Sequence, residues 1–275
     1  MTGARQTRYL GTMHTIRDGI LDGKVAFITG GTSGINLGIA RRLAQAGAHV
    51  AVLGRNVEKA NAAAKELAAF GTKTLAVNAD VRDPKALEDV IGKAVSALGA
   101  IDVLVCGAAG NFVAPAMGMS PNGFKAVMDI DVLGTFNACR LAFDHLNKPG
   151  ACVLNVSAPQ AGHPAVMQAH VCAAKAGVDM MTKVLAMEWG PAGVRVNSIW
   201  PGAVDGSEGM MRLAPTPEAR AQLTSTLPLG RFATNDDIAE MALFLCSPGA
   251  SYVTGSVVVV DGGMSLVGFT ALMPR

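Results

Sequence analysis

Seven short runs of apolar, often β-branched residues alternate with longer stretches of helical character from Lys24 onward. The runs lack polar alternation, as expected of strands buried on both faces. Neighbouring parallel strands need long return connections, and right-handed crossovers place helices on both faces of the sheet. The pattern therefore predicts an α/β fold with a doubly wound, seven-stranded parallel sheet. The predicted strands are Val25 to Thr29, His49 to Leu53, Lys73 to Val77, Ile101 to Cys106, Ala151 to Val156, Val194 to Ile199 and Val257 to Asp261.

Apolar residues spaced three and four apart predict the helices between these strands. Residues 1–22 lack the pattern and are expected to form an N-terminal tail, whereas 23–275 form one domain. Glycines and prolines break up residues 203–226 beyond the sixth strand, where α/β sheets bind ligands, so this segment is predicted to be a substrate lid. The predicted helices are Val57 to Phe70, Pro84 to Leu98, Ser120 to Leu146, Ala169 to Trp189 and Thr234 to Leu245.

A glycine-rich turn follows the first strand and leads into a helix. Glycines at such a turn let the backbone approach a pyrophosphate, whose charge then lies at the helix N-terminus. The turn therefore predicts a Rossmann-like dinucleotide site in which Gly30, Thr32, Ser33, Gly34 and Ile35 contact the cofactor.

The second predicted strand ends in Leu53, Gly54 and Arg55, without the acidic residue that binds an adenosine ribose 2′-hydroxyl. An arginine there suits a 2′-phosphate, which it can bind through charge-assisted hydrogen bonds. Arg55 therefore predicts NADP(H) rather than NAD(H) as the cofactor.

The composition excludes several other classes of protein. A net charge of +2 without a long basic run argues against nucleic-acid binding. No stretch offers the roughly 20 apolar residues of a membrane span. The five cysteines are odd in number and lack zinc spacing, so we expect reduced thiols in a cytoplasmic protein without a metal site. Only 16% of the residues are charged, which suggests surface covered in a homo-oligomer, a dimer or a tetramer.

Several motifs together resemble the short-chain dehydrogenase/reductase family over roughly Gly23 to Gly263. They are Thr29-Gly30-x-x-x-Gly34-Ile35, Asp80-Val81, Cys106-Gly107-Ala108-Ala109-Gly110, Lys175, Pro201-Gly202 and the closing Asp261-Gly262-Gly263. The resemblance implies that Asp80 and Val81 lie at the adenine, that Ala108, Ala109 and Gly110 line the cofactor cleft, and that Pro201, Gly202 and Val204 border the nicotinamide. Asn36 departs from the family pattern, because it replaces the third glycine of the turn.

A second departure concerns the proton donors for carbonyl reduction. Most members of this family use a serine and a tyrosine, whose positions here are Ala158 and Val171. The chain has only two tyrosines, Tyr9 in the tail and Tyr252 near the C-terminus. Hydride addition to a C=O needs a proton delivered at oxygen, so this loss disfavours alcohol dehydrogenation. Hydride can instead add to the far carbon of a conjugated thioester, which needs hydrogen-bond donors at oxygen and a proton at carbon.

Asp131 stands where most family members have an active-site asparagine, in the same predicted cleft as Lys175. Together with Asn111-Phe112 and Gly206-Ser207-Glu208-Gly209, this resembles the peroxisomal-type 2,4-dienoyl-CoA reductases. The resemblance implies NADPH-dependent reduction of a 2,4-dienoyl-CoA to a 3-enoyl-CoA in unsaturated fatty-acid oxidation, with Asp131 and Lys175 as the catalytic residues. Lys175 is expected to hold the nicotinamide ribose and, with Asp131, to polarise a water that protonates the substrate.

Candidate substrate contacts surround this predicted centre. His170 precedes the vacant tyrosine position and could donate to the thioester oxygen, and Met210 and Met211 of the lid could contact an acyl chain. The candidate substrate residues are Asn111, Phe112, Gln160, His170 and Ser207.

Three alternative functions stay open. The first is an enoyl-thioester reductase, although its usual tyrosine, seven residues before the lysine, is here Gln168. The second is a reductase of a non-CoA unsaturated carbonyl compound. The third is a silent NADP(H)-binding protein that has lost the chemistry. The terminal Leu272-Met273-Pro274-Arg275 is not a peroxisomal address, which favours a cytoplasmic setting.

Overall fold

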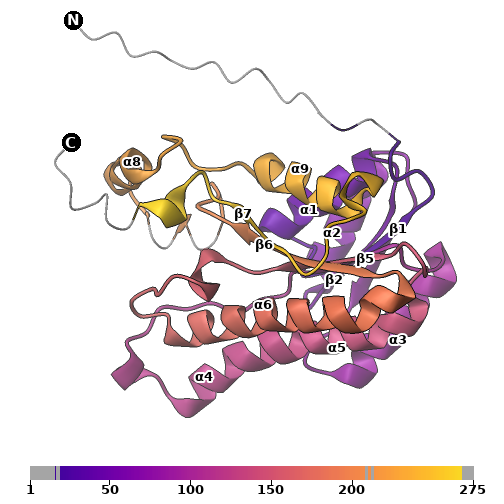
Figure 1. Ribbon diagram of the computed structural model, residues 1–275, viewed down its shortest axis with the longest axis horizontal. Coiled ribbons are helices and arrows are strands. Elements are labelled where there is room, and N and C mark those ends of the chain that lie inside the picture. The colour runs from indigo at the N-terminus through magenta and orange to yellow at the C-terminus, as the bar shows by residue number, and fades with distance from the viewer. Residues whose placement is uncertain (1–15, 17–18, 208–209, 212–213, 268–275) are drawn as a thin grey trace, which may run out of the picture.

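The computed structural model describes residue 16 and residues 19–207, 210–211 and 214–267. Seven parallel strands form one sheet in the order β3-β2-β1-β4-β5-β6-β7 (Figure 1). The order confirms the doubly wound sheet, and the strands agree with the predicted ones to within three residues at each end. The strands are β1 Val25–Thr29, β2 His49–Gly54, β3 Thr74–Asn78, β4 Val103–Cys106, β5 Cys152–Val156, β6 Arg195–Pro201 and β7 Val257–Val260.

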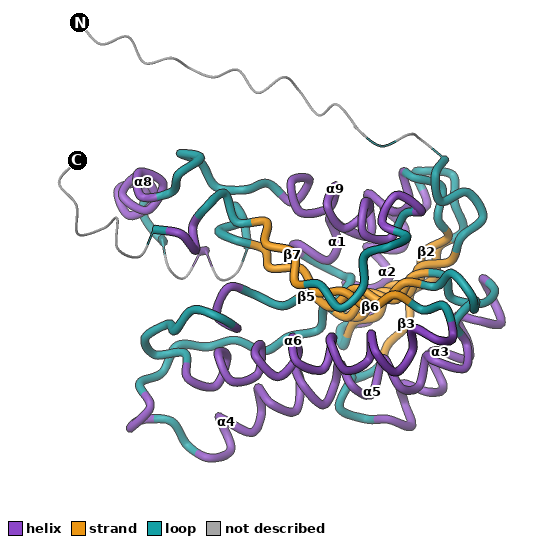
Figure 2. The backbone as a smooth tube through the Cα atoms, viewed as in Figure 1, coloured by secondary structure: helices purple, strands orange, loops and turns teal. Residues whose placement is uncertain are grey.

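Helices cover both faces of the sheet (Figure 2). Side chains of a strand point alternately to the two faces, so Ala26 and Ile28 pack with α1, α2 and α9, whereas Phe27 packs with α3, α5 and α6. The principal helices are α1 Gly34–Gln45, α2 Val57–Ala68, α3 Pro84–Leu98, α4 Pro121–Met128, α5 Gly134–Ala142, α6 Ala169–Trp189, α8 Pro217–Thr226 and α9 Asn235–Cys246.

The predicted helix from Ser120 to Leu146 is not one regular α-helix. A π-helical turn, Asp129–Leu133, joins α4 to α5, and a 3-10 turn follows at Phe143–His145. A π-turn inserts one additional residue and shifts the side chains around it, which is why such turns are frequent at functional sites. Asp131 lies in the middle of this turn and is buried.

The structure describes only part of the predicted N-terminal tail and of the predicted lid. Leu21, inside the predicted tail, is buried in the core, and its backbone N–H donates to the Ala46 carbonyl. Residues 1–15 and 17–18 of the predicted tail lie outside the described residues, as do 208–209 and 212–213 of the predicted lid. The described part of the lid contains α8 and the buried Met210. No helix of the described residues is long and apolar enough to cross a membrane.

Candidate functional site

The chain reverses its direction of winding between β1 and β4, and the carboxyl ends of these strands open a crevice. Doubly wound sheets bind their ligands at this position. Two adjoining cavities of about 370 and 410 Å³ lie there and share Asn36, Gly107 and Ala109 in their walls. The first also contains the predicted cofactor residues Gly30, Thr32, Ser33, Arg55, Asp80, Val81 and Ala108. The second contains Gly34, Ile35, Gly110, Lys175, Pro201 and Gly202.

The turn between β1 and α1 has the geometry of a phosphate cradle. Gly30 and Gly34 have φ angles of +68° and +56°, which L side chains rarely adopt. A Cβ on Gly30 would also lie 2.9 Å from Ala108 Cα. Ser33 caps α1 without a side-chain hydrogen bond, and no acidic residue occupies the first turn. The helix N–H groups and the positive end of the helix dipole therefore remain available to an anion, and these residues fit a dinucleotide pyrophosphate.

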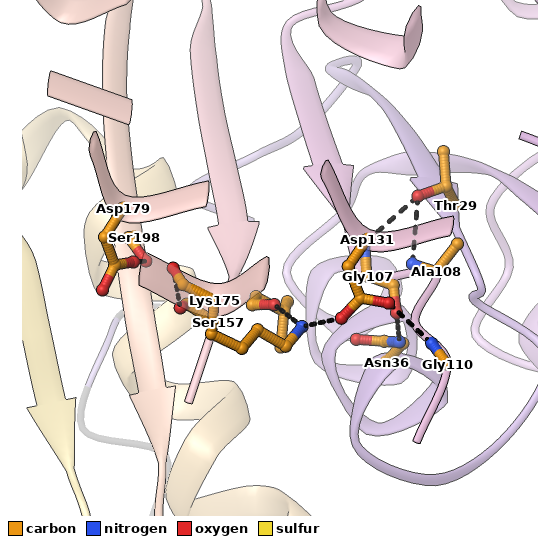
Figure 3. A network of polar contacts seen from close by, with 11 residues as sticks. Thr29, Asn36, Gly107, Ala108, Gly110, Asp131, Ser157, Lys175, Asp179 and Ser198 are labelled. Carbon is orange, nitrogen blue, oxygen red and sulfur yellow. Dashed lines mark hydrogen bonds and ion pairs between the residues drawn. The ribbon is translucent and has the colours of Figure 1, made fainter. Parts of the chain in front are cut away.

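Asn36, the departure from the glycine pattern, ties this turn to β4. Its Nδ2 donates to the Gly107 carbonyl at 2.7 Å, while Thr29 Oγ1 accepts from the backbone N–H groups of Gly107 and Ala108 (Figure 3). A Cβ on Gly107 would lie only 2.3 Å from Asn36 Oδ1, so the glycine directly after β4 makes room for the asparagine.

Basic side chains line the end of the first cavity near β2. Arg55 and Lys59 both contribute to its wall. Asp80, also in the wall, forms a salt bridge with Arg82, whose Nη2 donates to Asp80 Oδ2 at 2.6 Å. The hydrogen bond from Arg82 and the positive charges of Arg82 and Arg55 lower the pKa of Asp80. Because Arg82 neutralises the one acid, the positive charges of Arg55 and Lys59 dominate this end.

The π-turn brings Asp131 to Lys175 of α6. Asp131 Oδ2 lies 3.1 Å from Lys175 Nζ, and both side chains are buried. The other carboxylate oxygen, Oδ1, accepts from the Gly110 N–H at 2.7 Å, and Lys175 Nζ also donates to the Val156 carbonyl at 3.1 Å (Figure 3). Among the described residues Asp131 Oδ2 has no hydrogen-bond partner, so its contact with Lys175 is an ion pair, and Lys175, which donates to Val156, keeps two of its three donors for the second cavity that it lines. The pair can thus orient a water or a hydroxyl at the cavity wall.

Comparison with known proteins agrees with this geometry. A family model described as enoyl-(acyl carrier protein) reductase matches residues 30–265. The chain belongs to the short-chain dehydrogenase/reductase family. A solved dehydrogenase/reductase from Sinorhizobium meliloti 1021 has a TM-score of 0.82 and 35% identity, covering 89% of this chain and 96% of that one.

Two curated relatives carry more specific names. A rat protein named peroxisomal 2,4-dienoyl-CoA reductase, (3E)-enoyl-CoA-producing, is 44% identical over 253 residues, which are 91% of this chain and 86% of that one. A Bacillus subtilis protein, "Probable 2,4-dienoyl-CoA reductase, (2E)-enoyl-CoA-producing", is 39% identical over 249 residues, which are 90% of this chain and 98% of that one. The two names differ in the position of the remaining double bond.

The two positions at which the family usually carries its serine and tyrosine are apolar in this chain. Ala158 and Val171 both line the second cavity, close to Lys175. The nearby hydroxyl of Ser157 is buried and donates to the Lys175 carbonyl at 3.4 Å. The wall where the family delivers a proton to oxygen therefore has no hydroxyl at either position.

Not all the predicted contacts face the cavities. Asn111, Gln160 and Ser207 line the second one, as does Met210. Phe112 and His170 are in neither wall; their rings pack against each other with centroids 4.3 Å apart. The structure therefore does not support the prediction that His170 donates to the thioester oxygen, because this side chain packs against Phe112 and lies outside both cavity walls.

Val204 is also absent from both walls. It is fully buried in the core and pairs with Ala233 in an isolated β-bridge, because the chain turns inward after Gly202. The structure instead places Gln168 in the second cavity wall, a residue that sequence reasoning treated only as a missing tyrosine.

Proposed function

We propose that this protein is an NADPH-dependent reductase that converts a 2,4-dienoyl-CoA to a 3-enoyl-CoA in unsaturated fatty-acid oxidation. The observation that carries the proposal is the buried ion pair of Asp131 and Lys175 beside a wall whose serine and tyrosine positions are Ala158 and Val171. Such a wall has no hydrogen-bond donor for a carbonyl oxygen at those two positions. It keeps a charged pair that can orient a water for proton transfer. The names of both relatives support a 2,4-dienoyl-CoA as the substrate, and the name of the rat protein supports the 3-enoyl product.

NADPH, when bound, would supply the hydride that adds to C5 of the conjugated thioester. The chain's own residues then have two tasks: to stabilise negative charge on the thioester oxygen and to deliver a proton to C2. Lys175 would hold the nicotinamide ribose hydroxyls and, with Asp131, orient a water toward C2. The carboxylate and the ammonium keep the site near neutral, so this water can be held without a large cost in burying net charge.

A substrate comparison tests the proposal. NADPH consumption is followed with hexadienoyl-CoA, a 2-enoyl-CoA and a 3-ketoacyl-CoA, and the product is identified by NMR. We expect turnover with the dienoyl-CoA and a 3-enoyl product. A 2-enoyl product would contradict the assigned site of protonation, and activity confined to the ketoacyl substrate would overturn the function. Saturable NADPH binding without any turnover would indicate a silent binding protein.

The preference for NADPH rests on Arg55 and Lys59 at the adenosine end of the first cavity. Replacing Arg55 with alanine should raise KM for NADPH by about 10- to 100-fold, because a charge-assisted hydrogen bond contributes roughly 1.5–3 kcal/mol. KM for NADH should change by less than about threefold, because NADH has no 2′-phosphate to bind this group. Steady-state kinetics with both cofactors measure the effect.

Lys65→Ala is the matched control, because Lys65 is an exposed cation on α2 outside both cavity walls. An equal loss for NADPH and NADH in Arg55→Ala would contradict a role in recognising the 2′-phosphate.

The protein is further proposed to be a homo-oligomer, with copies meeting at α6. Met180, Val184 and Met187 follow one another at helical spacing along α6 and are 60, 44 and 80% exposed. Leu133 and Phe136 add exposed apolar surface beside the π-turn. A second copy of this apolar surface would cover it, and the low charged fraction of the chain agrees with that.

Sedimentation equilibrium tests the assembly. We expect a dimer or a tetramer for the wild type and a shift to monomer for Val184→Lys/Met187→Glu, because charges at an apolar contact oppose association. A monomeric wild type would refute the proposal.

We also place the protein in the cytoplasm. The five cysteines are all free in the structure, and the hydrogen bond with Cys139, whose sulfur is 3.7 Å away, together with burial raises the pKa of the Cys106 thiol. Unlinked thiols this close are expected in a reducing compartment. Fractionation of the native cells would test this, and recovery in a membrane or secreted fraction would contradict it.

A further inference from the structure

The reaction proposed above leaves one requirement without a residue: a donor for the thioester oxygen. Hydride addition at C5 moves negative charge onto that oxygen, and preorganised donors aimed at it lower the barrier. The apolar Ala158 and Val171 offer none.

The other polar side chains of the second cavity wall are each engaged with another part of the protein. Asn36 donates to the Gly107 carbonyl, Ser157 to the Lys175 carbonyl and Ser207 to the Val204 carbonyl. Asn111 is engaged in a contact of its own. Lys175 is committed to Asp131 and Val156 and, in the proposed function, to the cofactor and the water.

Gln168 and Gln160 remain, and they are bonded to each other. Gln160 Nε2 donates to Gln168 Oε1 at 3.0 Å, and both residues line the cavity. Within the described part of the chain, the NH₂ group of Gln168 has no hydrogen-bond acceptor. Gln168 is only 6% exposed as a residue, but its side-chain nitrogen is not among the fully enclosed unpaired polar atoms, so this NH₂ group is open to the cavity. A pocket that keeps such a donor fits a ligand with an oxygen acceptor.

The backbone before Gln168 is held in a strained conformation. Met167 has a φ of +65° and is the one non-glycine residue with positive φ among those described. Such strain persists where the surroundings enforce it and is common at functional sites. The Met167 carbonyl accepts from the Ala114 N–H at 3.0 Å, which fixes the chain at the point where Gln168 begins α6.

The partner amide is fixed as firmly. Gln160 lies in the 3-10 turn Pro159–Ala161. Trp200 packs against Gly162, the residue that follows this turn, so closely that a Cβ there would be 2.6 Å from the indole. Trp200 Nε1 donates to Asp179 Oδ2 at 2.7 Å, and Asp179 Oδ1 accepts from the Ser198 hydroxyl at 2.7 Å. This buried network holds the indole and, through it, the turn that carries Gln160.

We propose that Gln168, oriented by Gln160, is a catalytic residue that donates a hydrogen bond from its side-chain NH₂ to the thioester carbonyl oxygen of the bound acyl chain. The proposal rests on the proposed function, because it needs a conjugated thioester in the second cavity. Gln168 binds the oxygen as its negative charge grows, while Asp131 and Lys175 direct the proton to carbon. The two tasks thus fall to different residues at the cavity.

The sharpest variant is Gln168→Glu. An ionised glutamate still accepts from Gln160 Nε2 and has nearly the same shape, but it has no donor. Gln168→Leu removes both functions. Each variant should bind NADPH as the wild type does, with kcat for hexadienoyl-CoA lowered by about 100-fold or more, as found on removing one such donor.

A spectroscopic measurement separates this role from a structural one. A hydrogen bond to the carbonyl polarises the conjugated system and shifts its ultraviolet absorption to longer wavelength. Hexadienoyl-CoA bound to the enzyme–NADP⁺ complex, which cannot transfer hydride, should show this red shift in the wild type and in the control Gln45→Leu, an exposed glutamine at the end of α1. Gln168→Glu should bind the thioester without the shift, and Gln160→Leu should retain most of it.

The possible failures are distinguishable. If Gln168→Glu showed the same red shift as the wild type and a kcat within about threefold of it, the role of Gln168 would be overturned. Loss of the shift in Gln160→Leu but not in Gln168→Glu would transfer the donor to Gln160 and equally refute the assignment. A wild type that binds the dienoyl thioester with the Gln168-dependent shift but does not reduce it would refute the proposed function and leave the donor role supported.

Discussion

Asp131→Asn should lower kcat for a 2,4-dienoyl-CoA by about 10²- to 10⁴-fold, the usual contribution of a positioned proton-transfer group. The asparagine retains an oxygen to accept from the Gly110 N–H but no longer carries the charge that pairs with Lys175. Lys175→Met should cause a similar or larger loss. NADPH binding to Asp131→Asn, measured by fluorescence titration, should change by less than about threefold, because Asp131 lies in neither cavity wall.

The matched control is Asp129→Asn. Asp129 begins the same π-turn but pairs with Lys125 on the solvent side, so its loss should leave kcat unchanged. Near-normal turnover in Asp131→Asn would exclude the proton-transfer role proposed for Asp131. Its carboxylate would then have only the structural role of holding the Gly110 N–H.

Gly107→Ala should lower the free energy of unfolding by about 1–3 kcal/mol, the usual cost of overpacking a tight site. The new Cβ would meet Asn36 Oδ1 at 2.3 Å, and Asn36 is fixed by its bond to the Gly107 carbonyl. Asn36 and Gly107 line both cavities, so a shift of either residue should also raise KM for NADPH. Urea denaturation and steady-state kinetics measure the two effects.

A double-mutant cycle isolates the contact. In an Asn36→Ala background the clash is removed, so Gly107→Ala should cost at least about 1 kcal/mol less than in the wild type. Gly92→Ala is the control, because a Cβ on Gly92 in α3 meets nothing within 4 Å. Strictly additive effects of the Asn36 and Gly107 substitutions would show that the two residues do not interact.

Much of the cofactor end could be predicted from sequence because the signals are local. Gly30 and Gly34 are required by the backbone of one turn, and Arg55 follows directly from the end of one strand. The glycine turn and the arginine at the strand end each depend on a few consecutive residues, so both can be recognised in the sequence. The strand ranges follow from the hydrophobic pattern, and the doubly wound parallel arrangement follows from the long return connections and the handedness of crossovers.

The substrate end depends on contacts between distant segments, and the predictions there were less accurate. His170 and Gln168 lie two residues apart at the start of α6, and no local pattern distinguishes the second as the cavity residue. The direction of α6 turns His170 toward Phe112 and leaves Gln168 in the cavity wall. Val204 was misplaced for the same reason, since its β-bridge to Ala233 is a long-range contact.

The sequence by itself determined the parallel sheet, the phosphate cradle and the loss of the family's usual serine and tyrosine, because each depends on residue type at a local spacing. Only the tertiary structure decided which side chains meet in the cavity. The π-turn that brings Asp131 within 3.1 Å of Lys175, and the bond between Gln160 and Gln168, join segments whose separation is fixed by packing. A difference of one residue in a helical turn rotates a side chain by about 100°, and no local pattern records that rotation.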